Sequence, residues 1–530
     1  MSDEMISAPH SYHTFIFPFL YQSGTKKVGR SEFAKCLHKG FYDDTFIAVD
    51  NPSKEEYDRY RYFNRAARNA IYMAERNNSA VVWNYRFDLE AIACGKEPQT
   101  GEWHKEQHGS ENPARIIIDK AIKKDNDAGE EYIESVFHAE LALNSVRVKL
   151  FDTGVGMLIF ELENYNYPDE KTVKRINEFG RRVFVPFIKS NCKRHCPVCA
   201  DTVSLMFNNE PIKGASGLIS GAAEGKTDEI TLSPIVKFFL SGEEKSITTS
   251  QKPADNEFCI EPIIDDRMFV ACIYNNEDMA ARMKEWDNEA GNYRVFTDAL
   301  KLSPEAEHNV SRRFYELLFV DGDGITCLNR KMLSDLIEKH SYGRWIEYGT
   351  ITGITDYSMM CVTNSFPDAL LPFLSEYIEM VILALAQRAS LLAFKRAISE
   401  ISCKKTKLNV KDVHERYIVF QSELLLHEVT PQQQGIELYT LMLDKLFVTD
   451  HQEFIENQID SLYDLDTSNH EKRENKILFI LSVFGIFEIV STIFGDWLEL
   501  GNWWCLGIGL AAIVVSLIIC FFKLPIKYKK

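Results

Sequence analysis

Two long apolar segments close the sequence, and they constrain the fold more than any other feature of the chain. Residues 476–494 (KILFILSVFGIFEIVSTIF) contain one charged residue, Glu488, after the opening Lys476, and residues 503–522 (WWCLGIGLAAIVVSLIICFF) contain none. At ~1.5 Å per residue these segments form helices ~28 and ~30 Å long, which matches the hydrocarbon core of a bilayer. The short link between them allows only an antiparallel pair, so the sequence predicts a two-helix transmembrane hairpin.

Basic residues flank this hairpin on one side. Lys472, Arg473 and Lys476 surround the start of the first segment, and four lysines lie in the tail at residues 523–530. The connecting loop contains Asp496 and Glu499 but no basic residue. The positive-inside rule therefore predicts that both termini, including this basic tail, lie in the cytoplasm.

Glu488 is an acidic residue inside the first segment. A carboxylate at mid-membrane costs roughly 2–3 kcal/mol or more unless it faces water or a polar partner. Two spans per chain cannot enclose an aqueous path, so a channel would require a ring of subunits. Glu488 is therefore predicted to line a pore or to contact another subunit. A protonated carboxyl group between packed helices is the alternative.

The remainder of the chain is acidic and has an ordinary globular composition. Of 530 residues, 60 are Lys or Arg and 77 are Asp or Glu, for a net charge of −17, and 45% are apolar. This composition excludes a wholly disordered chain. An acidic body binds the nucleic-acid backbone poorly, so we expect no direct nucleic-acid partner. The N-terminus has no basic and apolar leader, so we expect no cleaved signal and reduced cysteines.

Residues 1–365 mix strand-like and helical runs, which predicts an α+β cytosolic sensor domain. The clearest strand-like runs are 12–20, 45–49, 80–85, 145–150, 156–162 and 268–274. Residues 366–475 are predicted to form a helical bundle and a stalk. In this region 368–402 is strongly apolar, but Gln387, Arg388 and Lys395 interrupt it, which indicates a core helix and not a membrane span.

Apolar residues at three- and four-residue steps predict one amphipathic helix from about residue 432 into the first span at 476–494. Such a helix would be ~95 Å long and would join the body to the membrane. Two shorter helices with a turn near residues 466–470 are the alternative.

Arg181 and Arg182 are the predicted ligand-binding residues. They follow a helical run at 173–179 and precede a strand-like run at 183–188. Two adjacent guanidinium groups suit phosphate capture, because Arg forms bidentate charge-assisted hydrogen bonds. Ordinary salt bridges on an acidic surface are the alternative.

Cys192, Cys196 and Cys199 have C-x3-C-x2-C spacing, with His195 between them. The spacing matches the iron–sulfur loop of radical S-adenosylmethionine enzymes, and the four groups also suit zinc. Four ligands within eight residues cannot easily all reach one ion, so reduced structural cysteines are the default interpretation. Whether these cysteines bind a metal stays open at this point.

Two further motifs carry less information. Residues 220–227 (SGAAEGKT) end like a phosphate-binding loop, but Ser220 stands where that loop needs Gly, and Pro234 follows soon after. Residues 321–324 (DGDG) resemble the start of a calcium loop without its later ligands. No Ser/His/Asp set or carboxylate pair has telling local spacing, so we predict that the protein is not an enzyme, has no catalytic residues and has no resident cofactor.

The order of these elements resembles the CorA family of divalent-cation transporters, which are ring-shaped homo-oligomers. The Gly-Met-Asn signature of that family has no full counterpart here, where residues 494–497 read FGDW. Segments 15–20 (FIFPFL), 152–164 (DTGVGMLIFELEN), 176–187 (INEFGRRVFVPF), 342–357 (YGRWIEYGTITGITDY) and 383–394 look like the divergent CorA-like branch found with type III CRISPR systems.

This resemblance implies a bacterial inner-membrane effector of antiviral defence that forms a ring-shaped homo-oligomer. Its ligand would be a nucleotide second messenger, S-adenosylmethionine joined to AMP, and binding would open or disrupt the membrane. The alternative is a magnesium-type divalent-cation transporter or channel. A membrane-anchored enzyme is a third hypothesis, which no catalytic set supports.

Overall fold

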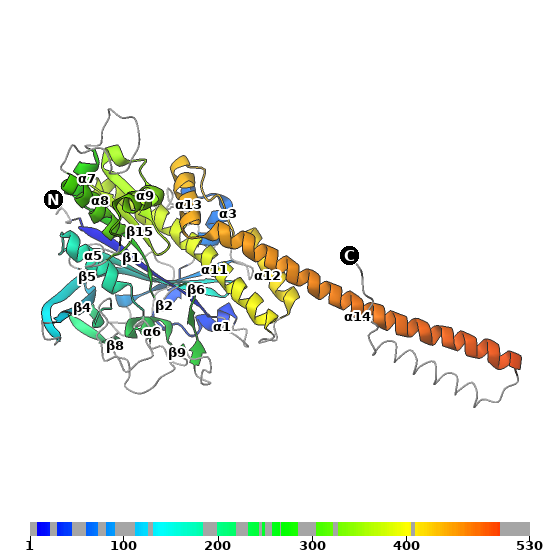
Figure 1. Cartoon of the computed structure of the whole chain (residues 1–530). Coiled ribbons are helices and arrows are strands. Elements are labelled where there is room, and N and C mark those ends of the chain that lie inside the picture. The colour runs from blue at the N-terminus through cyan, green and yellow to red at the C-terminus, as the bar shows by residue number, and fades with distance from the viewer. Residues whose placement is uncertain are drawn as a thin grey trace. The chain divides into compact units, whose positions relative to one another are not determined.

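The computed structural model describes residues 8–21, 29–44, 60–72, 81–90, 112–125, 131–183, 199–218, 232–242, 246–249, 257–264, 267–284, 304–321, 327–403 and 409–498 (Figure 1). The chain divides into two units. The first is Met1–Leu408 with Glu415–Ile455, and the second is Asn409–His414 with Glu456–Lys530. The predicted second span at 503–522 and the basic tail lie outside the described residues.

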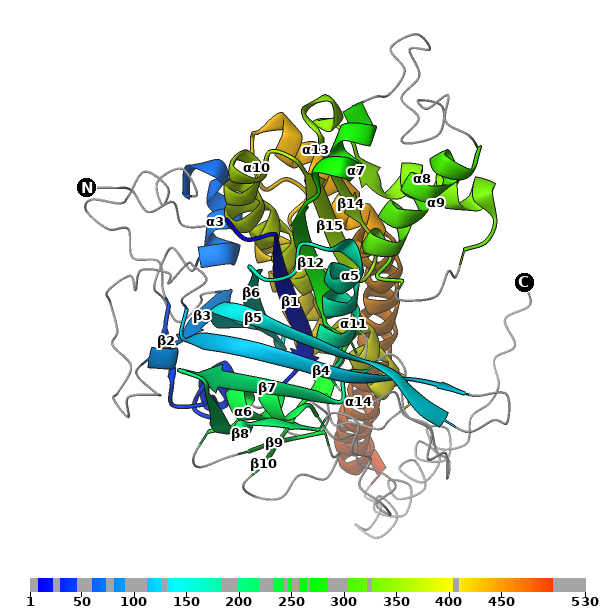
Figure 2. The ribbon, with the colours of Figure 1, turned by 90° about the vertical axis from the view of Figure 1, so that its left-hand side faces the viewer.

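A mixed sheet organises the first unit, and thirteen strands of the described residues belong to it. Its main path is β13 (Ser341–Tyr342), β14 (Thr350–Ile354), β15 (Ser358–Thr363), β12 (Phe269–Asn275), β1 (Ser11–Leu20), β6 (Val155–Asn164), β5 (Glu131–Phe151), β4 (Ala114–Asp125), β7 (Thr202–Phe207) and β8 (Glu210–Leu218) (Figure 2). Off this path lie β2 (Phe41–Asp43), β3 (Val82–Phe87) and β11 (Glu261–Pro262). A separate pair is formed by β9 (Ser246–Thr248) and β10 (Glu257–Cys259).

The centre of the sheet is buried on both faces. Every residue of β1 and of β6 is buried, and the two strands pair antiparallel in register from Ser11↔Asn164 to Leu20↔Val155. Strands covered on both faces read as continuous apolar runs, which is why the sequence located them. The predicted strands at 12–20, 156–162 and 268–274 are confirmed. The run at 145–150 is part of the longer β5, and 45–49 lies outside the described residues.

Helices cover both faces of this sheet. Alternation along β1 directs Phe15, Phe17 and Phe19 into one core, together with residues of α5 (Glu170–Gly180) and α6 (Pro234–Leu240). Pro18 and Leu20 face α11 (Ile378–Ser402), with which they line two cavities. The result is an α/β domain with helices on both sides of a large mixed sheet.

Further helices pack around these layers. They are α1 (Arg30–Ala34), α3 (Arg65–Tyr72), α7 (Glu277–Lys284), α8 (Pro304–Leu318), α9 (Arg330–His340), η1 (Ile346–Tyr348), α10 (Phe366–Pro372), η2 (Phe373–Tyr377), α12 (Val410–Glu423), α13 (Gln433–Lys445) and α14 (Val448–Leu498).

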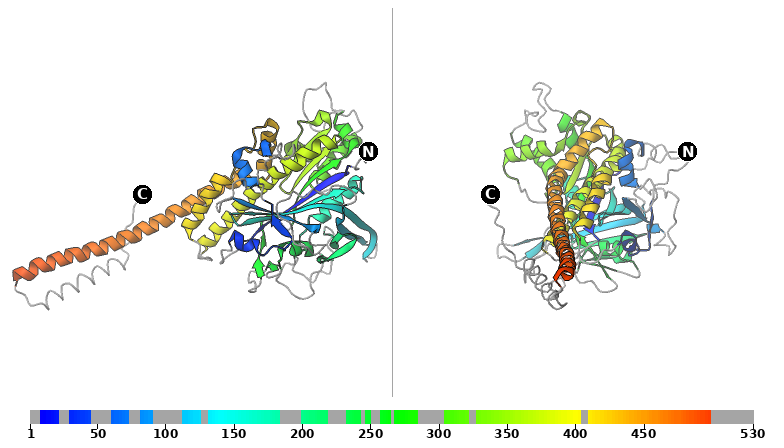
Figure 3. Two further views of the ribbon diagram at one scale, coloured as in Figure 1. Left: turned by 180° about the vertical axis from the view of Figure 1, so that it is seen from behind. Right: turned by 90° about the vertical axis from the view of Figure 1, so that its right-hand side faces the viewer.

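The longest apolar helix of the first unit lies against the sheet (Figure 3). The helix Phe366–Ser402 is long and apolar enough to cross a membrane, but 61% of its most apolar window is buried inside the protein. It runs continuously through α10, η2 and α11. Burial against the sheet is the packing that the sequence predicted for a core helix.

The predicted continuous helix from residue 432 is wrong at one position. Helix α13 ends at Lys445, and Phe447 adopts a positive φ of 55° before α14 begins at Val448. The break lets Leu446 and Val448 both be fully buried. The alternative turn near residues 466–470 is also wrong, because α14 is uninterrupted there. One residue with a positive φ breaks a helix without changing the spacing of the apolar residues on either side, so the sequence pattern does not reveal the break.

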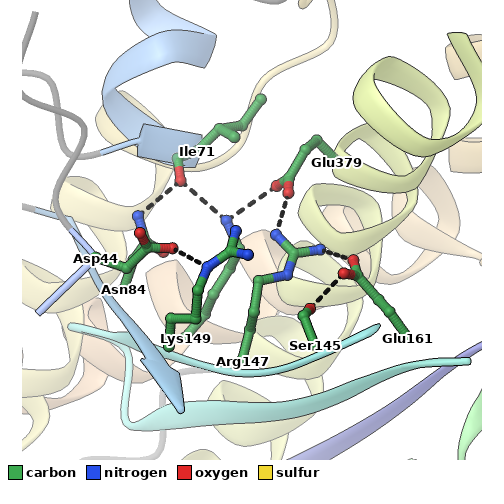
Figure 4. A network of polar contacts seen from close by, with 9 residues as sticks. Asp44, Ile71, Asn84, Ser145, Arg147, Lys149, Glu161 and Glu379 are labelled. Carbon is green, nitrogen blue, oxygen red and sulfur yellow. Dashed lines mark hydrogen bonds and ion pairs between the residues drawn. The ribbon is translucent and has the colours of Figure 1, made fainter. Parts of the chain in front are cut away.

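Four charged side chains, none more than 12% exposed, tie α11 to the sheet (Figure 4). Arg147 on β5 donates to Glu161 on β6 and to Glu379 on α11, at 2.6 Å in each case. Lys149 donates to Glu379 at 2.9 Å and to the carbonyl oxygen of Ile71 on α3 at 3.0 Å. Each cation therefore lies against a carboxylate, and four elements, β5, β6, α11 and α3, meet at this network.

The electrostatics of this network favour the ionised form of Glu379. Burial works to raise the pKa of Glu379, but the charges of Lys149 and Arg147 outweigh it and lower the pKa to about 2. Removal of one partner from such a cluster leaves the remaining charges buried without compensation. The loss of stability then exceeds the net stability that the intact ion pair contributes.

We predict that Glu379→Gln lowers the free energy of unfolding by about 3–5 kcal/mol, because Arg147 and Lys149 lose their shared carboxylate. Urea unfolding of the full chain in detergent measures this change. Glu423→Gln on α12, an exposed position, is the matched control and should change stability by less than about 0.5 kcal/mol.

Comparison of the wild type with Glu379→Gln at different pH values tests the ionic role of Glu379. Because the pKa of Glu379 is lower in the folded chain than its ordinary 4.5, its contribution is complete above pH 4.5 and is lost as the pH falls toward 2. The difference between wild type and Glu379→Gln should therefore shrink over that range. A difference that stays constant down to pH 2.5 would contradict the ionic role.

Candidate ligand site

The predicted residues Arg181 and Arg182 lie where α5 ends. Asp169 caps the start of this helix by accepting a hydrogen bond from the Thr172 amide at 2.9 Å. At its end, a Cβ on Gly180 would come within 2.8 Å of the Phe15 ring, so the backbone packs directly on β1. Arg181 follows as the C-terminal cap and is only 3% exposed.

Arg181 is held by contacts that only the tertiary structure creates. Its Nη2 donates to Glu178 at 2.8 Å and to the carbonyl oxygen of Val320 at 3.3 Å. Its guanidinium lies 5.4 Å from the centroid of the Tyr357 ring. Among the described residues, its buried Nε and Nη1 have no hydrogen-bond partner, so the group has capacity for a further acceptor.

A third arginine belongs to the same cluster. Arg267 lies 5.3 Å from the centroid of the Tyr357 ring and pairs through its backbone with Arg182. We call Arg181, Arg182, Arg267, Glu178 and Tyr357 the guanidinium cluster. Arg267 and Tyr357 could not be predicted as site residues, because no local motif marks them and the fold alone brings them to α5.

Like charges crowd this cluster. Burial lowers the pKa of Arg181, Glu178 raises it, and the nearby charges of Arg267 and Arg182 lower it again. Burial likewise raises the pKa of Glu178, against the three arginines. An anion placed here would relieve the repulsion between the guanidinium groups, so the electrostatics favour a negatively charged ligand.

The backbone beside the cluster is strained. Val320 has a positive φ of 44°, which is an outlier for a β-branched residue, and its carbonyl oxygen accepts the hydrogen bond from Arg181. Such conformations persist only where the surroundings impose them, and they concentrate at ligand sites.

A cavity of about 60 Å³ adjoins Tyr357. It is lined by Pro18, Ile264, Arg267, Met268, Phe269, Asp356, Tyr357, Leu385 and Arg388. Guanidinium groups bind planar oxyanions through paired hydrogen bonds and also stack on aromatic rings. Chemically, the site suits an oxyanion attached to a flat ring.

Other predicted residues fall elsewhere. Glu488 lies on α14 and is exposed. Cys199 is buried, whereas Cys192, His195 and Cys196 lie outside the described residues, as does the segment 220–227. Within the described ranges, no group of three His, Cys, Asp or Glu side chains is arranged to hold a metal ion.

A buried Ser–His–Asn arrangement also went unnoticed in the sequence. The Oγ of Ser11 lies 2.9 Å from Nε2 of His13, and Nδ1 of His13 lies 2.7 Å from Oδ1 of Asn177. Ser11 and His13 are fully buried, and burial lowers the pKa of His13 to about 4. No surface reaches the hydroxyl, so this network joins β1 to α5 and does not present a nucleophile to a substrate.

Comparison of the chain with protein-family models, with curated proteins and with solved structures finds no match.

We predict that Arg181 and Glu178 are energetically coupled. Arg181→Gln leaves the Glu178 carboxylate buried without its partner. The substitution should therefore destabilise the wild type more than it destabilises the Glu178→Gln variant. A double-mutant cycle by urea unfolding should give a coupling energy of about 1–3 kcal/mol. Additive effects would contradict the ion pair.

Proposed function

We propose that this protein is a membrane-anchored receptor whose α/β domain binds a nucleotide-type ligand and whose C-terminal helices respond in the bilayer. The observation that carries the membrane part is the exposure of the apolar segment of α14. The exposed fractions are Ile477 57%, Leu478 59%, Phe479 49%, Leu481 61%, Phe484 46% and Ile486 62%.

These exposed side chains do not form a single stripe. Residues 477, 478 and 479 are consecutive, so they point in directions about 100° apart around the helix axis. A helix that is apolar on all sides belongs inside protein or lipid, and exposed apolar area of this kind marks an interaction surface. The core helix α11 differs in this respect, because the sheet covers it.

A two-span hairpin with both termini in the cytoplasm remains part of the proposal. It is supported by the uncharged segment at 503–522, by the lysines that follow it and by the acidic loop between the spans. A ring of subunits would place Glu488 at a pore or at a subunit contact, since two spans enclose no path alone.

The ligand part of the proposal rests on the guanidinium cluster. A nucleotide offers a phosphate for charge-assisted hydrogen bonds and a base for stacking. The cluster contains three guanidinium groups, and two of them, those of Arg181 and Arg267, lie over one tyrosine ring. The resemblance to the CorA-like branch associated with type III CRISPR systems suggests S-adenosylmethionine joined to AMP as the ligand. The proposed outcome of binding is an opened or disrupted membrane in antiviral defence.

Membrane insertion of the first span is testable by topology. The double variant Phe484→Lys/Ile486→Lys adds roughly 5–7 kcal/mol to the free energy of inserting the first span. Only the second span should then insert. A C-terminal tag would then move to the outer side. Protease treatment of intact spheroplasts should spare the tag in the wild type and remove it in the double variant.

Leu465→Lys is the matched control for topology, because Leu465 is 62% exposed on the same helix but lies before the apolar segment. It should leave the tag protected. A wild-type tag that the protease removes contradicts the two-span topology, and wild-type protein in the soluble fraction contradicts membrane anchoring.

Ligand binding is testable by calorimetry with the purified full chain and S-adenosylmethionine joined to AMP. Removal of a charge-assisted contact should weaken binding at least tenfold in Arg182→Gln and in Arg181→Gln/Glu178→Gln, which keeps the buried charge balanced. Lys171→Gln, an exposed position on α5, is the control and should bind as the wild type does. Magnesium conductance in liposomes without nucleotide binding would favour the divalent-cation transporter instead.

A further inference from the structure

The cavity beside Tyr357 lies between two arginines from different elements. Arg267 precedes β12, and Arg388 lies on α11. We infer that this cavity binds a singly charged phosphodiester group through Arg267 and Arg388, and that occupation draws Arg388 away from the corner between α13 and α14. The inference rests on the proposed function and deepens it, since it names the ligand group and the route to α14.

The size of the cavity selects a small group. Its volume of about 60 Å³ accommodates several waters or one phosphate-sized group, but not a whole nucleotide. Pro18, Met268 and Leu385 supply apolar walls, and a low local dielectric strengthens hydrogen bonds between charged groups. The phosphate therefore enters the cavity while the remainder of the ligand stays outside.

The charges around the cavity select a monoanion. Arg267 and Arg388 line it together with the acidic residue Asp356. Two cations and one anion leave one positive charge, which a phosphodiester neutralises. A phosphate dianion would bring a second negative charge against Asp356, and like charges at a shared site are unfavourable.

Arg388 connects this cavity with the start of α14. Its Nη1 donates to the carbonyl oxygen of Asp356 at 2.7 Å, in the turn between β14 and β15. Its guanidinium also lies 5.7 Å from the centroid of the Phe447 ring, which is within the range of a cation–π contact. Phe447 lies between the end of α13 at Lys445 and the start of α14 at Val448.

The corner itself is held in an unfavourable conformation. Phe447 has a φ of 55° and a side chain that is 44% exposed, and such a backbone persists only when its surroundings impose it. Its carbonyl oxygen accepts the amide of His451 in the first turn of α14 at 3.1 Å. The charge of Arg388 reaches that turn as well, because burial first and then Arg388 and Lys395 lower the pKa of His451.

The ligand and the Phe447 ring, which lies between α13 and α14, therefore compete for the guanidinium group of Arg388. A charge-assisted hydrogen bond to a phosphodiester is stronger than a contact with a half-exposed aromatic ring. Binding would remove the cation from Phe447 and favour a different arrangement of the corner. A ligand shifts such an equilibrium only through a contact that differs between the two states, and Arg388 is that contact.

The test uses the purified full chain in detergent, the dinucleoside monophosphate ApA as a phosphodiester probe, and adenosine as the uncharged probe. Calorimetry at constant ionic strength should show binding of ApA but not of adenosine. Arg267→Gln and Arg388→Gln should each weaken ApA binding at least tenfold. Arg396→Gln, on the same helix but ion-paired with Glu261 outside this cavity, should stay within twofold of the wild type.

Hydrogen exchange of residues 444–452 measures the corner in the same samples. ApA should raise exchange of this segment at least threefold in the wild type, and Arg388→Gln should show raised exchange without ligand. Phe447→Leu keeps an apolar side chain but removes the ring, so it should bind ApA normally and lose the response to it.

The outcomes separate this inference from the proposed function. Full ApA affinity in both Arg267→Gln and Arg388→Gln excludes the cavity as the site, even if the variants of Arg181 and Arg182 lose nucleotide binding. Unchanged exchange of residues 444–452 on ApA binding excludes the coupling. Equal affinity for ApA and adenosine excludes the phosphodiester as the recognised group, whereas membrane topology is unaffected by any of these results.

Discussion

The packing of α11 across the central sheet is the constraint on which the rest of the first unit depends. This helix is too apolar to face water, and the sheet covers it. Three of its polar residues bind to different parts of the domain. Glu379 joins the charged network of β5 and β6, and Gln387 donates to the carbonyl oxygens of Leu424 and Leu426 beyond α12. Arg388 reaches the turn between β14 and β15.

Two buried groups of charges in this domain have opposite characters. In the network of Glu379, each cation lies against a carboxylate, which suits a structural role in holding a helix on a sheet. In the guanidinium cluster, three arginines approach one another, and burial first and then the charges of Arg267 and Arg182 lower the pKa of Arg181. Crowded like charges concentrate at functional sites, which is why we propose a structural role for the first group and ligand binding for the second.

Much of the framework could be predicted from local pattern. The apolar runs at β1, β6 and β12 located the central strands, because strands buried on both faces carry continuous apolar sequence. Gln387 and Arg388 correctly indicated that 368–402 is a core helix, since polar side chains inside a span require partners. The break at Phe447 was missed, because one residue with positive φ leaves the apolar spacing on either side intact.

The candidate site was predicted only in part. Arg181 and Arg182 stood out as adjacent cations at the end of a helix. The structure places Arg181 beside Tyr357 and pairs the backbone of Arg182 with that of Arg267. Arg388 had been noted only as an interruption of an apolar helix. No spacing rule connects these residues, because sheet pairing and helix packing bring them together from distant parts of the chain.

The amino-acid sequence by itself determined the apolar C-terminal segments, the central strands and the acidic character of the body, because each of these follows from composition over a short window. Tertiary structure alone decided which charges are balanced and which are crowded, and where α13 gives way to α14. These properties depend on residues far apart in the chain, and only the packed sheet and its helices set the distances between them.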